Sequence, residues 1–273
     1  MKFWPLLLLF VLAACQPTAG ISPTETPSSA AVTPQVLEVI CSEGLMPVIR
    51  VLASTYQHIN TATQIVVIER ADQLAVQALK LNDADLIAVS WLPDSEETWA
   101  TPFARDGLAL IIHPQNGIPG LTTDQLKQLF QGQVEDWEPW GGLPGAPQII
   151  SREEASGDYA FFQQRVMRDA RVALTGLLAP SSSAMLDLVS HDPLAIGYLS
   201  TSQLDGQVRA LAIDGVPPAP ETITANLYPL SRNLYLVTQG EPHTVARDFI
   251  QWILSAEGQR LVLDQGLLQA PQP

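Results

Sequence analysis

The sequence predicts an α/β fold of two lobes, with the second lobe inserted into the first. From residue 36 to about residue 112, short β-branched runs alternate with segments of helical period, as expected for helices packed on a sheet. A separate block of strands and helices follows, and a strand and two helices return at the C-terminal end. An interrupted lobe explains this return, and two hinged lobes can close on a ligand.

Residue type and spacing predict the elements of the first block. Strands are expected at residues 36–40, 64–69, 85–89 and 107–112. Helices are expected between the first three strands, at residues 45–58 and 71–81. The strands are rich in β-branched residues, whereas apolar residues recur every three or four positions in the helices. The chain is expected to cross into the second lobe after His113 and Pro114.

The second block begins with a helix at residues 124–130, which Thr122 or Thr123 is suited to cap. Further expected elements are a strand at 148–151, a helix starting near Ser156, a helix at 184–190, strands at 195–199 and 207–213, and a proline-rich connection at 215–220. The returning elements are a strand at 233–238 and helices at 244–254 and 257–263. Lobe 1 is therefore expected to comprise residues 36–113 and 225–273, and lobe 2 residues 114–224.

The N-terminal region is expected to lie outside the folded body. Residues 1–14 combine Lys2 with an apolar stretch too short to span a membrane, which is typical of an export signal. Small residues precede Cys15, as at a bacterial lipoprotein cleavage site, so Cys15 is predicted to be acylated and to anchor the protein to the extracytoplasmic face of the bacterial cell membrane. Residues 15–35, rich in Pro, Ser and Thr, would form the tether. The alternative is an ordinary signal peptide with a chance cysteine.

Composition excludes several classes of function. The net charge of -14 argues against nucleic acid as a partner, although an acidic protein can bind an anion where donors converge. The four histidines lie far apart without zinc-site spacing, so neither a metal nor a cofactor is expected. Cys41 is expected to be a buried, inert thiol. No acid, base and nucleophile set is organised in the sequence, so an enzyme is not expected.

Residues 151–162 are the most informative segment. Arg152 offers a planar fork that can hold two oxyanion oxygens, and Glu154 is expected to hold that guanidinium in place. Ser156 adds a hydroxyl, and Gly157 lets a ligand approach the backbone at a helix start. The alternative is a capped helix beside a surface ion pair.

Two further loops are expected to face the same ligand. Ser42 and Gly44 follow the strand at 36–40, and Ser90 follows the strand at 85–89. The carboxyl ends of strands are where α/β sheets usually bind ligands. Trp91, Trp99, Trp137 and Trp140 can line an organic-ligand cleft, although packing explains most such tryptophans.

Five segments, taken in order, resemble the phosphate-binding proteins of ABC importers, a subfamily of the periplasmic binding proteins. They are residues 121–142, 151–162, 192–198, 228–232 and 254–259. The resemblance implies the two-lobed periplasmic-binding-protein fold and a lipoprotein that binds phosphate or a similar tetrahedral oxyanion. It also implies delivery to an ABC permease in the membrane, with a monomer as the default state.

Three positions depart from the pattern of that subfamily. Glu43 brings a carboxylate near the expected anion, Asp158 replaces the usual threonine, and Ser90-Trp91 stands where some members have Asp or Arg. Asp158 can accept the proton of a hydrogen phosphate, or it can simply favour the first turn of its helix. These departures leave open an envelope sensor or interaction protein with a degenerate anion site, or a binder of another small ligand.

Overall fold

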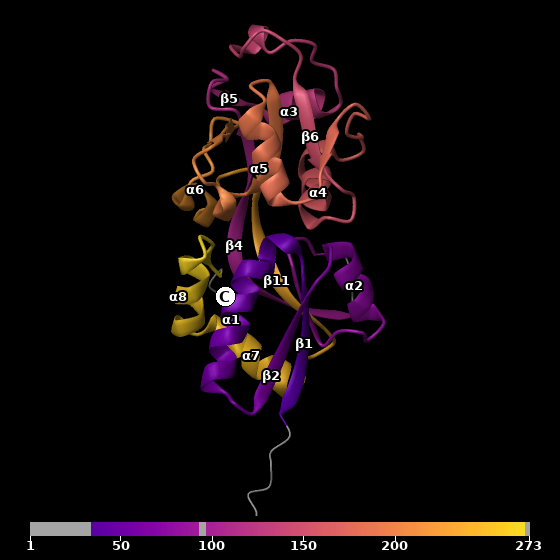
Figure 1. Ribbon diagram of the computed structural model, residues 1–273, viewed down its shortest axis with the longest axis vertical. Coiled ribbons are helices and arrows are strands. Elements are labelled where there is room, and N and C mark those ends of the chain that lie inside the picture. Colours follow the sequence, from indigo (N-terminus) through magenta and orange to yellow (C-terminus); the bar gives the residue numbers. More distant parts are fainter. Residues whose placement is uncertain (1–33, 93–96, 271–273) are drawn as a thin grey trace, which may run out of the picture. The chain divides into compact units, whose positions relative to one another are not determined.

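A computed structural model describes residues 34–92 and 97–270 of the chain (Figure 1). The predicted export signal and the lipid anchor at Cys15 lie outside the described residues. Within residues 34–92 and 97–270, no helix has the length and apolar character needed to span a membrane.

The described part of the chain is a mixed α/β structure. Its strands are β1 (Gln35–Cys41), β2 (Thr63–Glu69), β3 (Leu86–Val89), β4 (Thr98–Ile112), β5 (Gly120–Leu121), β6 (Gln148–Arg152), β7 (Leu177–Ala179), β8 (Ala195–Ser200), β9 (Arg209–Ala210), β10 (Ala212–Ile213), β11 (Ser231–Gln239) and β12 (Leu268–Gln269). Its α-helices are α1 (Met46–Ile59), α2 (Asp72–Lys80), α3 (Thr123–Phe130), α4 (Gly157–Phe162), α5 (Ser182–His191), α6 (Pro220–Thr224), α7 (Thr244–Leu254) and α8 (Ala256–Asp264). Short helical turns lie at Glu43–Leu45, Glu138–Trp140, Gln163–Met167 and Thr201–Gln203.

One long strand, β4, links two halves of a mixed sheet. The strand order is β2-β1-β3-β11-β4-β8-β6-β7. Residues 98–107 of β4 pair with β11, and residues 108–112 pair with β8. Strand β1 is parallel to β2 and β3, whereas β11 is antiparallel to β3 and β4. Strands β4 and β11 therefore connect the two lobes (Figure 1).

Each half of the sheet has a hydrophobic core on both faces. On β1, Leu37 and Val39 pack with α1 and α7, whereas Ile40 faces α2, because successive side chains of a strand point to opposite faces. In the second lobe, one core contains Phe130 and Phe162, and another contains Met185 of α5. The predicted fold, with the second lobe inserted in the first, is confirmed.

The lobe boundaries predicted at 113/114 and 224/225 remain predictions. The core of the first lobe extends along the chain to Ala104 and resumes at Leu234, whereas the core of the second lobe begins at Leu108 and ends at Leu230.

Two predicted strands need correction. The strand predicted at 107–112 begins at Thr98, because its first part pairs with β11 although Arg105 and Asp106 interrupt the apolar pattern. The strand predicted at 207–213 is two short strands, β9 and β10, which pair with β4 and β5 respectively. The chain changes partner between them, and periodicity cannot reveal this change.

Candidate functional site

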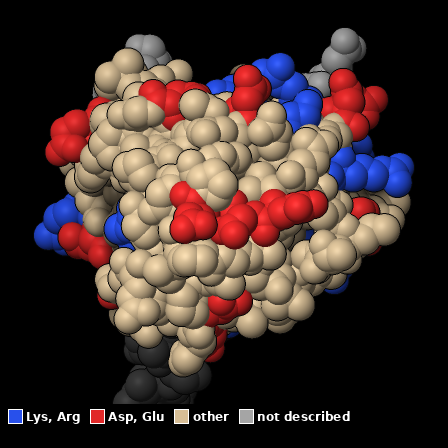
Figure 2. Space-filling model, turned by 90° about the horizontal axis from the view of Figure 1, so that it is seen from above, with Lys and Arg blue, Asp and Glu red and all other residues tan. Residues whose placement is uncertain are grey.

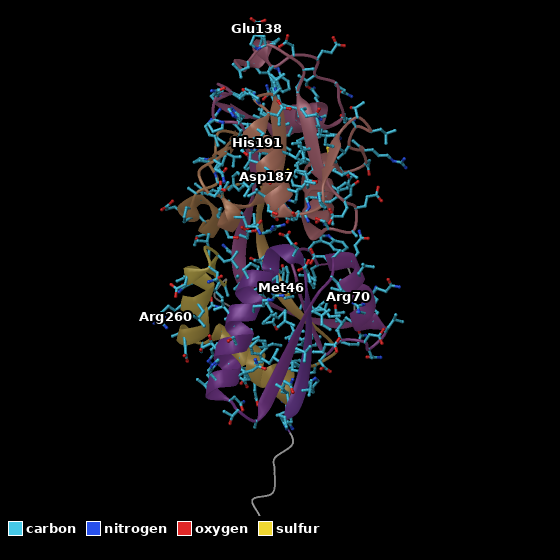
Figure 3. All side chains as sticks on the ribbon, viewed as in Figure 1. Met46, Arg70, Glu138, Asp187, His191 and Arg260 are labelled. Carbon is cyan, nitrogen blue, oxygen red and sulfur yellow. The ribbon has the colours of Figure 1, made fainter. Side chains whose placement is uncertain are left out.

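A central pocket of about 120 Å³ lies at the carboxyl ends of β1, β2, β3 and β6. All seven residues singled out from the sequence line this pocket: Ser42, Gly44, Ser90, Arg152, Ser156, Gly157 and Asp158. Arg70, which also lines this pocket, is labelled in Figure 3. The volume is below the range of about 300–1,000 Å³ typical of pockets for organic ligands. The central pocket therefore suits an ion or a very small solute.

Arg152 ends β6 and is 5% exposed. Its guanidinium lies 3.4 Å from the Glu153 carboxylate, 3.7 Å from that of Glu43 and 3.8 Å from that of Asp158. The prediction that Glu154 holds this side chain is wrong, since the neighbouring Glu153 does so. All of these contacts are longer than the roughly 2.7–2.9 Å of a good charged hydrogen bond. Arg152 is thus buried and charged but loosely held.

Glu43 places a carboxylate at the start of α5. Its Oε2 accepts from the Ser182 backbone N–H at 3.3 Å and from the Ser182 hydroxyl at 3.1 Å. A helix N-terminus favours a negative charge. The Glu43 carboxylate, which departs from the pattern of the subfamily, therefore has hydrogen-bond donors within the protein itself.

Arg232, in contrast to Arg152, is held tightly by two carboxylates. Its Nη2 donates to Asp106 Oδ2 at 2.8 Å, and its Nη1 lies 2.7 Å from Asp158 Oδ1. Burial lowers the pKa of Arg232, but the carboxylates of Asp158 and Asp106 outweigh this effect and raise it above its usual value. Asp158 therefore contacts two arginines in addition to lying in the first turn of α4.

Asp72 is a second buried carboxylate at the pocket, and sequence analysis missed it. It opens α2, is 1% exposed, and accepts from the Ser90 hydroxyl at 2.9 Å and the Ser90 N–H at 3.3 Å. Burial raises its pKa from 3.8 to about 6, against the lowering effect of the Ser90 hydrogen bonds. Asp72 is therefore mostly ionised at pH 7 and offers an acceptor to the pocket.

Gly157, in the second lobe, lies directly against Asp72 and Ser90 of the first lobe. A Cβ atom built on Gly157 would overlap with Asp72 Oδ2 and Ser90 Oγ. Beside it, the Gln73 N–H donates to the Ala155 carbonyl at 3.2 Å, and the Gln73 amide donates to the Glu154 carbonyl at 2.8 Å. A larger residue therefore fits here only if Asp72 and Ser90 shift or the lobes move apart.

Replacing Gly157 with alanine is expected to weaken these contacts and to open the lobes. The added methyl group meets buried oxygens, and such overpacking typically costs about 1–3 kcal/mol. Small-angle X-ray scattering should show a larger radius of gyration for Gly157→Ala than for the native protein.

Gly44→Ala is the matched control for that variant, because its Cβ would meet only Gln203 Nε2 at 3.7 Å, an ordinary contact. Equal scattering from Gly157→Ala and the native protein would contradict the expected opening.

Two of the remaining candidates, Cys41 and Trp137, are buried. Cys41 is buried, as predicted, and burial is the main cause that raises its pKa to about 12. Trp137 packs in the core, and Trp99 is exposed. Within residues 34–92 and 97–270, no group of three or more His, Cys, Asp or Glu side chains is arranged to hold a metal ion.

Comparison with known proteins places these features in context. A sequence profile of the PBP superfamily domain matches residues 28–257. The phosphate-binding protein PstS of Bacillus subtilis is 32% identical over 164 residues, 59% of this chain and 54% of that protein, so the match spans about half of that relative. PstS of Borreliella burgdorferi is 25% identical over 245 residues, 83% of this chain and 87% of that protein.

Two solved structures are similar over most of their length. A putative phosphate ABC transporter substrate-binding protein with bound phosphate from Clostridium perfringens matches with a TM-score of 0.80 and 26% identity, covering 87% of this chain and 100% of that one. An ABC-type phosphate transport receptor from Vibrio cholerae matches with a TM-score of 0.77 and 25% identity, covering 85% and 99%.

Proposed function

Because the chain belongs to the PBP superfamily domain family, we propose that it binds phosphate or a similar tetrahedral oxyanion as the solute-binding protein of an ABC importer. One observation carries this proposal. The residues chosen from the sequence as oxyanion ligands line a single small pocket, with a buried arginine whose donors are loosely engaged. The names of the relatives point to the same solute.

Arg152 is the main ligand of the oxyanion in this proposal. Its nearest carboxylate oxygen lies at 3.4 Å, so a bound oxygen at a shorter distance would become its strongest partner. Ser42 and Ser156 supply hydroxyl donors from two loops, and Ser90, whose own hydroxyl donates to Asp72, lines the pocket from a third loop. Gly44 and Gly157 let the anion approach the backbone, and no catalytic step is required.

Asp72 supplies discrimination between oxyanions. An ionised carboxylate accepts a hydrogen bond from a protonated oxyanion such as hydrogen phosphate, but it repels sulfate, which carries no proton at neutral pH. From the sequence, this role was a hypothesis for Asp158, but the Asp158 carboxylate is paired with Arg232 at 2.7 Å. Asp72 accepts from the neutral groups of Ser90 and pairs with no arginine among residues 34–92 and 97–270, which leaves it the better acceptor.

The same proposal includes the membrane anchor, the partner permease and the closure of the lobes. Cys15 carries the lipid, residues 16–35 tether the body to the extracytoplasmic face of the membrane, and an ABC permease receives the solute. The lobes, 36–113 with 225–273 and 114–224, close on the anion, and the protein acts as a monomer.

Calorimetric titration of the purified protein, stripped of bound anion, tests this function. We expect one-to-one phosphate binding of micromolar affinity or tighter, with sulfate at least about 100-fold weaker, which corresponds to about 2.7 kcal/mol. Asp72→Asn should reduce the ratio of phosphate affinity to sulfate affinity, because the asparagine amide can donate a hydrogen bond to sulfate. Asp187→Asn, at an exposed position on α5 (Figure 3), is the control.

A protein that binds no oxyanion would overturn the importer proposal. It would favour an envelope sensor or interaction protein that keeps the fold. The bond between Glu43 and Ser182 supports that second candidate, because the protein's own carboxylate already engages donors beside Arg152.

A further inference from the structure

We propose that a second pocket of this protein binds an organic anion, at a site separate from the central pocket. The second pocket has a volume of about 370 Å³ and shares Ser90 and Arg232 with the central pocket. Its other walls include Trp91, Arg105, Phe161, Ser231, Asn233 and Tyr235. Its volume lies within the range of about 300–1,000 Å³ that accommodates organic ligands, whereas that of the central pocket does not.

The charge of the second pocket is unusual for this protein. The chain carries a net charge of -14, and Figure 2 shows Asp and Glu side chains in a row across one face. Six Asp or Glu residues line the central pocket. Among the described residues that line the second pocket, two are arginines and none is acidic. This lining favours an anionic ligand.

Arg105 supplies the positive charge at this site. Its Nε donates to Asn233 Oδ1 at 3.3 Å, and its Nη1 donates to the Thr224 carbonyl. Both acceptors are neutral oxygens, which orient the guanidinium without cancelling its charge. Arg232, by comparison, is compensated by Asp106 and Asp158. A ligand anion in the second pocket would therefore bind chiefly to Arg105.

The aromatic walls indicate the remainder of the ligand. Trp91 and Tyr235 are half-buried, and the buried ring of Phe161 lies 5.5 Å from the Arg232 guanidinium carbon. Aromatic side chains with few charged neighbours favour planar or apolar groups. The ligand class is thus a small organic anion with a ring or an apolar body.

Ser231 provides an independent indication of a ligand. This residue is 9% exposed, and its hydroxyl oxygen has no hydrogen-bond partner among residues 34–92 and 97–270. A buried hydroxyl without a partner is unfavourable, so such groups usually meet a water or a ligand. Since Ser231 lines the second pocket, a bound ligand oxygen there can satisfy it.

The two pockets are separated by side chains that are firmly held. Arg232 is fixed by Asp106 at 2.8 Å, and Ser90 is fixed by Asp72 at 2.9 Å. Both pairs are buried. Occupation of the second pocket therefore need not displace an oxyanion in the central pocket.

Phenylphosphonate, which combines a ring with a tetrahedral anion, is a suitable probe. It is titrated by calorimetry into the protein in saturating inorganic phosphate, with tryptophan fluorescence as a second signal. We expect one-to-one binding with a submillimolar Kd, and at least tenfold weaker binding in both Arg105→Gln and Trp91→Ala. Arg247→Gln is the control, since Arg247 pairs with the exposed Glu241 on another surface.

Several results would overturn this inference. They are absence of phenylphosphonate binding, displacement of the probe by inorganic phosphate, and unchanged affinity in Arg105→Gln and Trp91→Ala. Thermal melting verifies that both variants fold. The phosphate titration of the native protein is a separate measurement, so failure of the second pocket is distinguished from failure of the central pocket.

Discussion

Replacing Arg232 with methionine should destabilise the protein by about 3–5 kcal/mol, the cost typical of removing one partner from a buried ion pair. The variant leaves the carboxylate of Asp106, whose side chain is 1% exposed, and that of Asp158 without their closest cation. Asp106 also accepts hydrogen bonds from Ser200 and Thr201 and cannot turn away easily. Urea denaturation followed by circular dichroism measures the change in the free energy of unfolding.

Two further variants make the Arg232 prediction specific. Arg247→Met removes an ion pair between exposed side chains and should cost less than about 1 kcal/mol. Adding Asp106→Asn and Asp158→Asn to Arg232→Met should recover part of the loss, because the unpaired charges disappear. A loss below about 1 kcal/mol in Arg232→Met would show that the ion pairs of Arg232 with Asp106 and Asp158 contribute little to the free energy of unfolding.

Replacing Arg152 with methionine is expected to weaken phosphate binding by at least about 100-fold. Two charged hydrogen bonds to the anion, at roughly 1.5–3 kcal/mol each, account for this loss. The unfolding free energy should change less than in Arg232→Met, since the carboxylates around Arg152 lie at 3.4–3.8 Å and two of them are substantially exposed. Calorimetry and urea denaturation of the same samples give both quantities.

Arg260→Met is the control for Arg152, because it removes an exposed arginine of α8 (Figure 3). Arg152→Lys should bind phosphate with intermediate affinity, since lysine keeps the charge but loses the bidentate fork. Native affinity in Arg152→Met would reject Arg152 as the main ligand and leave the backbone and hydroxyl donors to explain binding.

Most of the fold could be predicted from periodicity. The β-branched run at residues 36–40 predicts the strand β1, and the spacing of Ile49, Leu52 and Tyr56 predicts the buried face of α1. The first part of β4 escaped prediction because Arg105 and Asp106 interrupt the apolar pattern. Its pairing with β11 joins residues far apart in the sequence, and local patterns carry no such information.

The candidate site also has a part that the sequence predicted and a part that it did not. Arg152, Ser156 and Gly157 lie within one loop, so their chemistry and order indicated an oxyanion. Asp106 and Arg232 were missed because 126 positions separate them. One signal was available: a charged residue inside a buried strand requires an opposite charge nearby.

The sequence by itself determined the α/β class, the inserted lobe and seven of the residues that line the central pocket, because these depend on local spacing and on loop composition. Only the tertiary structure decided which partner each charged side chain has. Arg232 is committed to Asp106 and Asp158, Glu43 to Ser182, and Asp72 to Ser90. Electrostatic energy depends on distance in space and on burial, and both are set by the packing of strands and helices that are remote in the chain.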